Sequence, residues 1–239
     1  MNFAYRRILR FRPWAAIAFA CATAVVFAFA LVSDRDARAD ARLDSGFVSL
    51  FNGRDLTGWT RIGGKAEAWG VENGCLISYG EGGGWLATPK DYANFLLRLE
   101  FKLSPESNSG VYLRAPADMT RISRTGMEIQ LLDDGHPRYK TIKPYQRSGS
   151  IYEVAAAEAG HLRPTGEWNV MEIKLEGSKA TIRINSAVVV ADDLAKHPAE
   201  LEQAHPGIKR ETGRIGLQSH NGRVEFRAIE VKELGAPKS

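Results

Sequence analysis

A carboxylate and an amide two residues apart are the first candidates for chemistry in this sequence. Residues 127–132 read Met-Glu-Ile-Gln-Leu-Leu, and Arg114 ends an earlier strand-like run at 110–114. In a strand, Glu128 and Gln130 would share one face, because strand side chains alternate between the two sides of a sheet. Arg114, if it lies close to Glu128, would lower the pKa of this carboxylate and hold it ionised, as a general base requires. An ordinary solvated strand face would give the same pattern.

Few other polar residues have the spacing of a known site. The sequence contains no Walker loop, no Rossmann glycine fingerprint, no Gly-x-Ser-x-Gly elbow and no His-Glu-x-x-His pair. His220 follows a strand-like run and precedes an Asn-Gly turn, which suits either a structural or a functional role. Asp133, Asp134 and His136 could bind a cation through oxygen atoms, although a plain turn explains them as well. His161, His197 and His205 lie in polar stretches and are expected at the surface.

The first forty residues form a segment of a different kind. Four arginines precede an apolar run from Trp14 to Val32, and Ala37-Arg38-Ala39 follows. A basic region, an apolar region and a small-x-small pattern are the marks of a secretory signal. We therefore expect residues 1–39 to be removed and the protein to be periplasmic or secreted. The alternative is an uncleaved anchor in the inner membrane, because the apolar run approaches the length of a membrane span.

Removal of this segment changes the charge of the chain. The whole sequence has 32 basic and 28 acidic residues, and residues 1–39 hold six arginines and two aspartates. The mature domain therefore carries 26 of each and offers no case for nucleic-acid binding. Cys75 is the one cysteine left, so the sequence predicts no internal disulfide. Cys75 itself is expected to be a buried strand residue.

The remaining chain has the pattern of an all-β protein. Short apolar runs recur between turn signals such as Asn73-Gly74, and in residues 95–103 one face is wholly apolar while Arg98, Glu100 and Lys102 line the other. We predict about a dozen strands, with 151–154 as one short example, and a helical segment within 192–203 that Pro198 limits to two short pieces or to one helix that starts near the proline. No linker interrupts residues 46–234. We therefore expect one domain, residues 40–239, built as a sandwich of two antiparallel sheets.

Several motifs resemble those of one known family, in the same order along residues 46–234. The opening segment, GFVSLFNGRDLTGW at 46–59, resembles the start of the 3-keto-disaccharide hydrolase domain family, whose members are also described as 3-keto-glucoside lyases or 3-keto-2-hydroxyglucal hydratases. The other matching segments are 69–74, 95–101, 108–114, 128–130, 149–152, 166–169, 205–207, 213–220 and 224–227.

The resemblance implies a concanavalin A-like jelly-roll fold and an unusual cleavage reaction. A ketone at C3 of a glucoside acidifies the hydrogen at C2, so that a base can remove it; the aglycone then leaves C1, and water adds to the product. By this resemblance Glu128 would be the base, and Arg114 and His220 would stabilise the oxyanion and protonate the leaving group. The residues expected to orient the sugar are Gln130, Tyr152, Asn108 and Tyr112.

The same resemblance bears on cofactors and partners. The oxidation at C3 would be carried out by a partner sugar 3-dehydrogenase, so no redox cofactor is expected in this chain. A divalent metal remains an option, with Glu128, His220, Asp133 and Asp134 as conceivable ligands. Two other functions fit the sequence. One is a conventional glycosidase with two carboxylates, and the other is a non-catalytic carbohydrate-binding module, because aromatic and amide side chains also suit a lectin.

Overall fold

The computed structural model describes residues 46–118 and 120–235, and the described residues from Phe47 onward form one compact unit. The predicted signal segment, residues 1–39, lies outside the described residues. Strands dominate the fold, as the sequence predicted. They are β1 (Val48–Ser49), β2 (Thr60–Ile62), β3 (Trp69–Glu72), β4 (Cys75–Ser78), β5 (Trp85–Ala87), β6 (Phe95–Leu103), β7 (Asn108–Ala115), β8 (Met127–Leu132), β9 (Trp168–Glu176), β10 (Lys179–Ile184), β11 (Ala187–Asp193), β12 (Arg214–Gln218) and β13 (Val224–Glu233).

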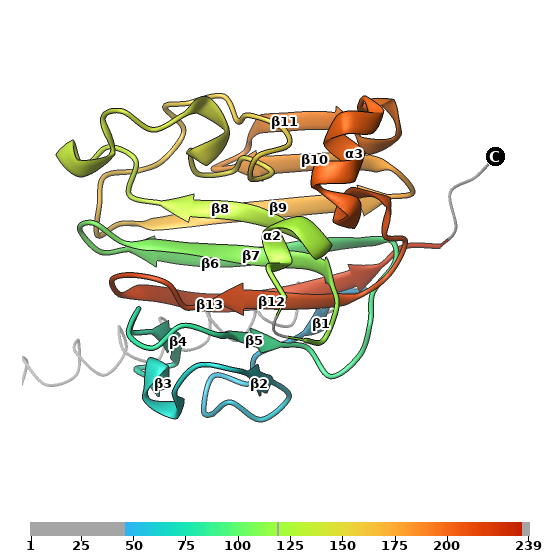
Figure 1. Cartoon of the computed structure of the whole chain (residues 1–239). Helices are drawn as coiled ribbons and strands as arrows, with labels where there is room; N and C mark the ends of the chain where they lie inside the picture. Colours follow the sequence, from blue (N-terminus) through green and yellow to red (C-terminus); the bar gives the residue numbers. More distant parts are fainter. Residues whose placement is uncertain (1–45, 119, 236–239) are drawn as a thin grey trace, which may run out of the picture. The chain divides into compact units, whose positions relative to one another are not determined.

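The strands form two antiparallel sheets that stack as layers (Figure 1). The larger sheet has the order β11-β10-β9-β6-β13-β4-β3, with β1 pairing to β13, and the smaller sheet has the order β2-β5-β12-β7-β8. Neighbours in the sheets are often distant in sequence, as when β12 inserts between β5 and β7. This arrangement confirms the predicted sandwich of two antiparallel sheets.

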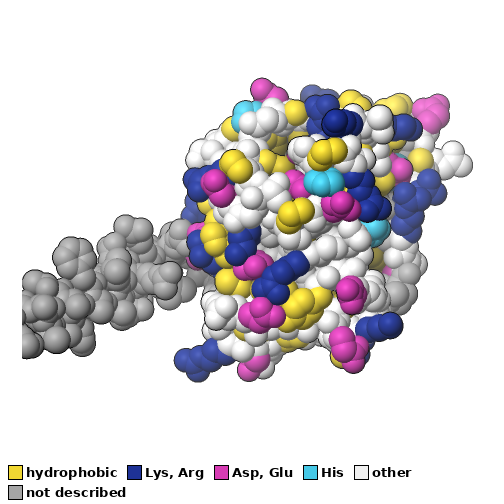
Figure 2. Space-filling view, turned by 90° about the vertical axis from the view of Figure 1, so that its left-hand side faces the viewer, with side chains coloured by type: hydrophobic (Ala, Val, Ile, Leu, Met, Phe, Trp, Pro, Cys, Tyr) yellow, Lys and Arg dark blue, Asp and Glu magenta, His cyan; other side chains and the backbone are white. Residues whose placement is uncertain are grey.

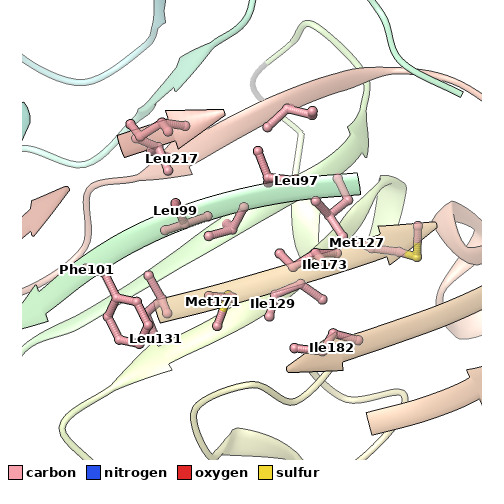
Figure 3. Close-up of a cluster of buried hydrophobic side chains, with 14 of the residues drawn as sticks. Leu97, Leu99, Phe101, Met127, Ile129, Leu131, Met171, Ile173, Ile182 and Leu217 are labelled. Carbon is pink, nitrogen blue, oxygen red and sulfur yellow. The ribbon is translucent and has the colours of Figure 1, made fainter. Parts of the chain in front are cut away.

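The core lies between the sheets and follows the predicted alternation. In β6 the side chains of Phe95, Leu97, Leu99 and Phe101 are fully buried, whereas the charged residues between them are partly exposed. Met171, Ile173 and Leu175 of β9 are buried on the same side, and Met127, Ile129 and Leu131 of β8 meet them from the smaller sheet (Figure 3). Burial of so many large apolar side chains supplies most of the driving force for folding.

The other face of the smaller sheet carries the side chains that alternate with the core. Leu86, Val111 and Leu217 belong to the core between the sheets. Their strand neighbours Trp85, Ala87 and Tyr112 form a second, smaller apolar cluster on the outer face, together with Ala115 and Ile122. Glu128 and Gln130 alternate with Met127, Ile129 and Leu131, so β8 presents them on this outer face. The outer face therefore combines apolar and hydrogen-bonding groups.

Short helical turns connect the strands. They are η1 (Ala66–Ala68), α2 (Ile122–Thr125), η2 (Pro137–Tyr139), η3 (Pro144–Gln146), η4 (Leu194–Lys196), α3 (Ala199–Ala204) and η5 (Pro206–Lys209). Two short helical pieces, η4 before Pro198 and α3 directly after it, occupy this segment, which is one of the two arrangements that the sequence predicted. The predicted strand at 151–154 is a turn instead, and only Ile151 makes isolated bridges, to Ile129 and Ala155. The sequence analysis did not foresee α2, which contacts β7, β8 and η5.

Basic and acidic side chains are interspersed over the face of the molecule shown in Figure 2. Cross-strand ion pairs on the larger sheet include Arg98 with Glu172 and Arg227 with Glu100. The mixture of charges in Figure 2 agrees with the equal numbers of basic and acidic residues in the sequence from residue 40 onward. Cys75 is buried in β4 as a free thiol, as expected. Within residues 46–118 and 120–235, we find no helix whose length and apolar character would allow it to cross a membrane.

Candidate active site

A cavity of about 260 Å³ lies on the outer face of the smaller sheet. Strands β7, β8 and β12 form its floor, and the segment that leads into α2 forms one wall. Five of its lining residues lie on these strands, four come from the 120–123 segment, and Tyr152 and His220 come from the connections that follow β8 and β12. The lining residues are Asn108, Tyr112, Thr120, Arg121, Ile122, Ser123, Glu128, Gln130, Tyr152, Gln218 and His220. Six of the seven predicted site residues are therefore together in one cavity.

Glu128 is a buried carboxylic acid at the centre of this group. Its residue is only 6% exposed, and burial is the main reason that the pKa of Glu128 is raised to about 8. A hydrogen bond from Gln218 and the positive charge of Arg121 act in the opposite direction and favour the ionised form. A group with this pKa can exchange a proton near neutral pH, which is the property that a general base or acid requires.

Polar side chains on neighbouring strands surround Glu128. Tyr112 lies directly opposite Glu128 across the β7–β8 pair, and its hydroxyl accepts a hydrogen bond of 2.7 Å from Gln218 Nε2. Burial and the nearby charge of Glu128 raise the pKa of Tyr112, which keeps the phenol protonated. Gln130 Nε2 donates to Asn108 Oδ1 at 3.1 Å. These contacts hold an ordered set of donors and acceptors of the kind that binds sugar hydroxyl groups.

Two predicted residues lie at the edges of the cavity. The backbone N–H of Tyr152 donates to the carbonyl of Glu128 at 2.9 Å, which fixes the turn at 151–154 beside β8. The ring of Tyr152 packs edge-on against Tyr145, with 6.3 Å between the ring centroids. His220 follows β12 and is exposed to solvent. Its imidazole is therefore accessible to a ligand in the cavity.

Arg114 does not lie at this site, contrary to the prediction. Its side chain is 3% exposed and donates hydrogen bonds to the carbonyls of Ala93, Gly177 and Arg210. The cause is a β-bulge: the register between β7 and β12 shifts, and Arg114 has a positive φ of 46°. Simple alternation would place the side chain of Arg114 on the same face as Tyr112, but the bulge redirects it. Arg114 consequently lines a different cavity, with Ala93 and Gly177.

The expected effect of Arg114 on Glu128 is also wrong. Arg114 was expected to lower the pKa of Glu128, but burial raises it to about 8. The basic residue that lines the cavity is Arg121, which the sequence analysis did not single out. One feature of the sequence could have identified Arg121. It lies in the polar loop between β7 and β8, the two strands that carry most of the predicted site residues. Loops on a rigid scaffold often carry functional groups.

Arg121 and the segment around it are held by a buried histidine and a glutamate. Arg121 Nη2 lies 3.2 Å from Glu153 Oε2. His205 was expected at the surface but is 4% exposed, with its Nδ1 3.2 Å from the carbonyl of Ser123 and its Nε2 3.6 Å from Glu153. This burial depends on Gly207, where a Cβ atom would come within 1.9 Å of the Gly126 carbonyl oxygen. The missing side chain allows η5 to pack closely on α2.

The acidic cluster that follows β8 belongs to another part of the molecule. Asp133 and Asp134 line a separate cavity with Thr165 and His161. Asp133 is buried and accepts hydrogen bonds from Glu106 N and Thr165 Oγ1. Among the described residues, no group of three or more His, Cys, Asp or Glu side chains is arranged to hold a metal ion. Glu128 and His220 share the first cavity and could contribute two ligands.

Comparisons with known proteins agree with this geometry. Residues 46–232 match the family described as the 3-keto-alpha-glucoside-1,2-lyase-like domain. A Bacteroides thetaiotaomicron protein named 3-keto-disaccharide hydrolase is 29% identical over 229 residues, which cover 79% of each chain. A crystal structure from Parabacteroides distasonis, described as a candidate glycosyl hydrolase, aligns with a TM-score of 0.70 and 25% identity over 80% of this chain and 95% of that one.

A more distant structure supports the fold alone. A Bacillus subtilis protein with a galectin-like fold aligns with a TM-score of 0.53 and 12% identity, over 73% of this chain and 89% of that one. The expected concanavalin-like sandwich is confirmed by this likeness and by the two antiparallel sheets. The chain is a carbohydrate-processing enzyme, and it belongs to the 3-keto-alpha-glucoside-1,2-lyase-like domain family.

Proposed function

We propose that this protein cleaves 3-keto-glycosides by elimination and hydration. Glu128 removes the hydrogen at C2, which the C3 ketone has made acidic. The electron pair forms the C1–C2 double bond, the C1–O bond breaks, and the leaving oxygen takes a proton. Water then adds across the double bond, so that the sum of the steps is hydrolysis of the glycosidic bond. Release of the unsaturated sugar before hydration would make the same chemistry a lyase reaction.

The observation that carries this proposal is the state of Glu128. It is a buried carboxylic acid with a pKa of about 8, and it lies in a cavity lined by hydrogen-bonding groups. A base of this strength suits the removal of a proton from carbon that a neighbouring ketone has acidified. A conventional glycosidase, in contrast, needs a second carboxylate on the other side of the scissile glycosidic bond.

The other residues of the cavity have distinct roles in this mechanism. Arg121 supplies positive charge for the enediolate oxygens, which is the role expected of Arg114 from the sequence. His220 is accessible and can protonate the leaving oxygen. Gln130, Asn108, Tyr112 and Tyr152 orient the sugar through their amide and hydroxyl groups.

A divalent cation would act as a Lewis acid on the enediolate oxygens. The cavity offers two protein ligands for such an ion, Glu128 and His220, and no third His, Cys, Asp or Glu side chain lines it in the described part of the chain. The steps above therefore rely on the chain's own groups. Activity with and without a chelator measures whether a cation is also required.

The alternative functions make different demands on the site. A conventional glycosidase needs two carboxylates on opposite sides of the scissile bond. Glu128 is the one carboxylate among the described residues that line the cavity, and the nearby Glu153 is ion-paired with Arg121. A non-catalytic binding module would bind sugars with these same side chains but would not require a carboxylic acid with a raised pKa. The site geometry therefore favours the elimination mechanism.

Turnover of matched sugars tests the proposal. A 3-keto-glucoside and the parent glucoside are incubated with the purified mature chain, and the released aglycone is measured. We expect release from the keto-sugar and none from the parent. Release from the parent would support the two-carboxylate glycosidase, and binding of both sugars without release would support the binding module.

We further propose that the enzyme acts outside the cytoplasm on sugars that a separate 3-dehydrogenase has oxidised. The support is the signal-like pattern of residues 1–39 and the need for a C3 ketone in the substrate. Mass spectrometry of the native protein should find a mature N-terminus at Asp40. A native chain that retains Trp14–Val32 would favour the anchored alternative.

A further inference from the structure

The wall of the proposed catalytic cavity includes an arginine that is held by two separate contacts. Arg121 lines the cavity together with Glu128, and its side chain is 54% exposed. Its Nη2 donates to Glu153 Oε2 at 3.2 Å, and its Nε donates to Ser123 Oγ at 3.2 Å. A long, half-exposed side chain keeps much of its rotamer freedom unless contacts restrict it. These two bonds therefore determine where the positive charge of Arg121 lies.

Glu153 is fixed relative to the strand that carries Glu128. It lies in the turn at 151–154, where the N–H of Tyr152 donates to the carbonyl of Glu128 at 2.9 Å. Ile151, at the start of this turn, forms a bridge to Ile129 of β8. Glu153 itself is not one of the residues that line the cavity. Its carboxylate therefore reaches the site through Arg121.

A buried histidine lies on the other side of the Glu153 carboxylate. His205 Nε2 is 3.6 Å from Glu153 Oε2, and His205 Nδ1 is 3.2 Å from the carbonyl oxygen of Ser123. A carbonyl oxygen can only accept, so Nδ1 carries a hydrogen and donates it. Because His205 is 4% exposed, its ring has little freedom to move. The ring limits the carboxylate to the side on which Arg121 lies.

The backbone at Glu153 has a conformation that stability alone does not explain. Its φ is 59°, in the left-handed region that residues with a Cβ atom adopt at a cost. An ion pair between partly exposed side chains contributes little stability in return. Glycine would adopt the same backbone without this cost. Strained residues of this kind cluster at functional sites, and Glu153 has a partner in one.

We propose that Glu153 is a positioning residue of the active site, whose carboxylate holds the guanidinium of Arg121 at the cavity. The proposal rests on the proposed function, in which Arg121 stabilises the enediolate oxygens. This charge develops only during the reaction, so a displaced Arg121 should lower kcat and leave KM nearly unchanged. A residue that served the fold alone would change the thermal midpoint instead.

The chain offers a matched control for Glu153 at Glu106. The φ of Glu106 is 61°, its Oε2 accepts from Arg138 Nη1 at 2.9 Å, and His136 Nε2 lies 3.7 Å from its Oε1. Neither Glu106 nor Arg138 lines the catalytic cavity. Glu153→Gly and Glu106→Gly thus remove the same kind of ion pair from the same kind of backbone. Both variants should keep a thermal midpoint close to the wild-type value, because glycine accepts a positive φ.

Nuclear magnetic resonance measures the position of Arg121 without any substrate. Relaxation of ¹⁵N gives the order parameter of the arginine Nε–H bond, and the signal missing from Arg121→Met identifies Arg121. In Glu153→Gly this order parameter should fall from about 0.8 to below about 0.6, and in Glu106→Gly it should keep the wild-type value. An unchanged Arg121 order parameter in Glu153→Gly would overturn the proposal.

Turnover of a 3-keto-glucoside connects this position with the reaction. Glu153→Gly should lower kcat at least about tenfold, whereas Glu106→Gly should keep the wild-type kcat. In the Arg121→Met background Glu153→Gly should cause no further loss, because the side chain that it holds is absent. Wild-type kcat in Glu153→Gly, or an equal loss in both backgrounds, would overturn the proposal. If the wild type does not cleave this sugar, the proposed reaction is wrong, and the order parameters still decide whether Glu153 positions Arg121.

Discussion

The side chain of Glu128 lies over the bare backbone of Gly110 on the adjacent strand. A Cβ atom at Gly110 would come within 2.7 Å of Glu128 Oε1 and 2.8 Å of its Cγ. Gly110 has no positive φ, so its backbone would accept other residues. The glycine is required here by space alone, because β7 must leave room for the carboxylic acid on β8.

Gly110→Ala should therefore impair turnover without removing any reactive group. The added methyl would push the carboxylate from its position, and a displacement of this size can lower kcat by about 10²-fold. Gly135→Ala is the matched control, because Gly135 has no atom within 4 Å of its Cβ position and no positive φ. Steady-state turnover of a 3-keto-glucoside by both variants makes the comparison. Wild-type kcat in Gly110→Ala would show that the packing is irrelevant to catalysis.

The raised pKa of Glu128 predicts the pH dependence of the reaction. Only the ionised form can accept the C2 proton, and burial raises the pKa of Glu128 to about 8. In the free enzyme, kcat/KM should rise about tenfold per pH unit up to about pH 8 and then level off. A profile that is already flat at about pH 6 would mean that the base has an ordinary carboxylate pKa.

The charge of Arg121 should affect the midpoint of the rise in kcat/KM with pH. Its positive charge lowers the pKa of Glu128, so its removal must shift the ascending limb to higher pH. Arg121→Met keeps much of the length but loses the charge, whereas Arg121→Lys keeps the charge. We expect the midpoint to move upward in the Met variant and to stay near the wild-type value in the Lys variant. Identical midpoints in the two variants would contradict an electrostatic role for Arg121.

Replacement of Arg114 should damage stability more than chemistry. Arg114→Met would remove the charged donor of the hydrogen bonds to the carbonyls of Ala93, Gly177 and Arg210, at about 1.5–3 kcal/mol for each bond. The thermal midpoint should fall by at least about 6 °C. Arg98→Met, which removes a surface ion pair with Glu172, should cost much less. A stable Arg114→Met protein with a shifted pH profile would contradict this account and show that Arg114 acts at the active site.

The sequence predicted the fold well where the pattern was local. The alternation in β6, β8 and β9 gave both the core and the face of Glu128 and Gln130, because a period of two determines which side each residue occupies. The hairpin at Asn73-Gly74 was likewise local, since both residues adopt positive φ. These features do not depend on distant parts of the chain.

Three of the failures depended on long-range contacts. The bulge that turns Arg114 away from the site arises in its pairing with β12, about a hundred residues later. His205 is buried only because Gly207 allows η5 to pack on α2. The pKa of Glu128 follows from burial by the assembled cavity. Each of these properties results from the packing of segments that are remote in sequence, which a single sequence does not reveal.

Comparison of two carboxylates that both have a raised pKa tests the central claim most directly. Glu128→Gln keeps the size and hydrogen-bonding capacity of the side chain but cannot accept the proton, so kcat on a 3-keto-glucoside should fall by about 10²-fold or more while binding persists. Asp134→Asn is the control, because burial also raises the pKa of Asp134, in the separate cavity. The account predicts wild-type turnover in Asp134→Asn. Near wild-type turnover in Glu128→Gln, or an equal loss in Asp134→Asn, would contradict it.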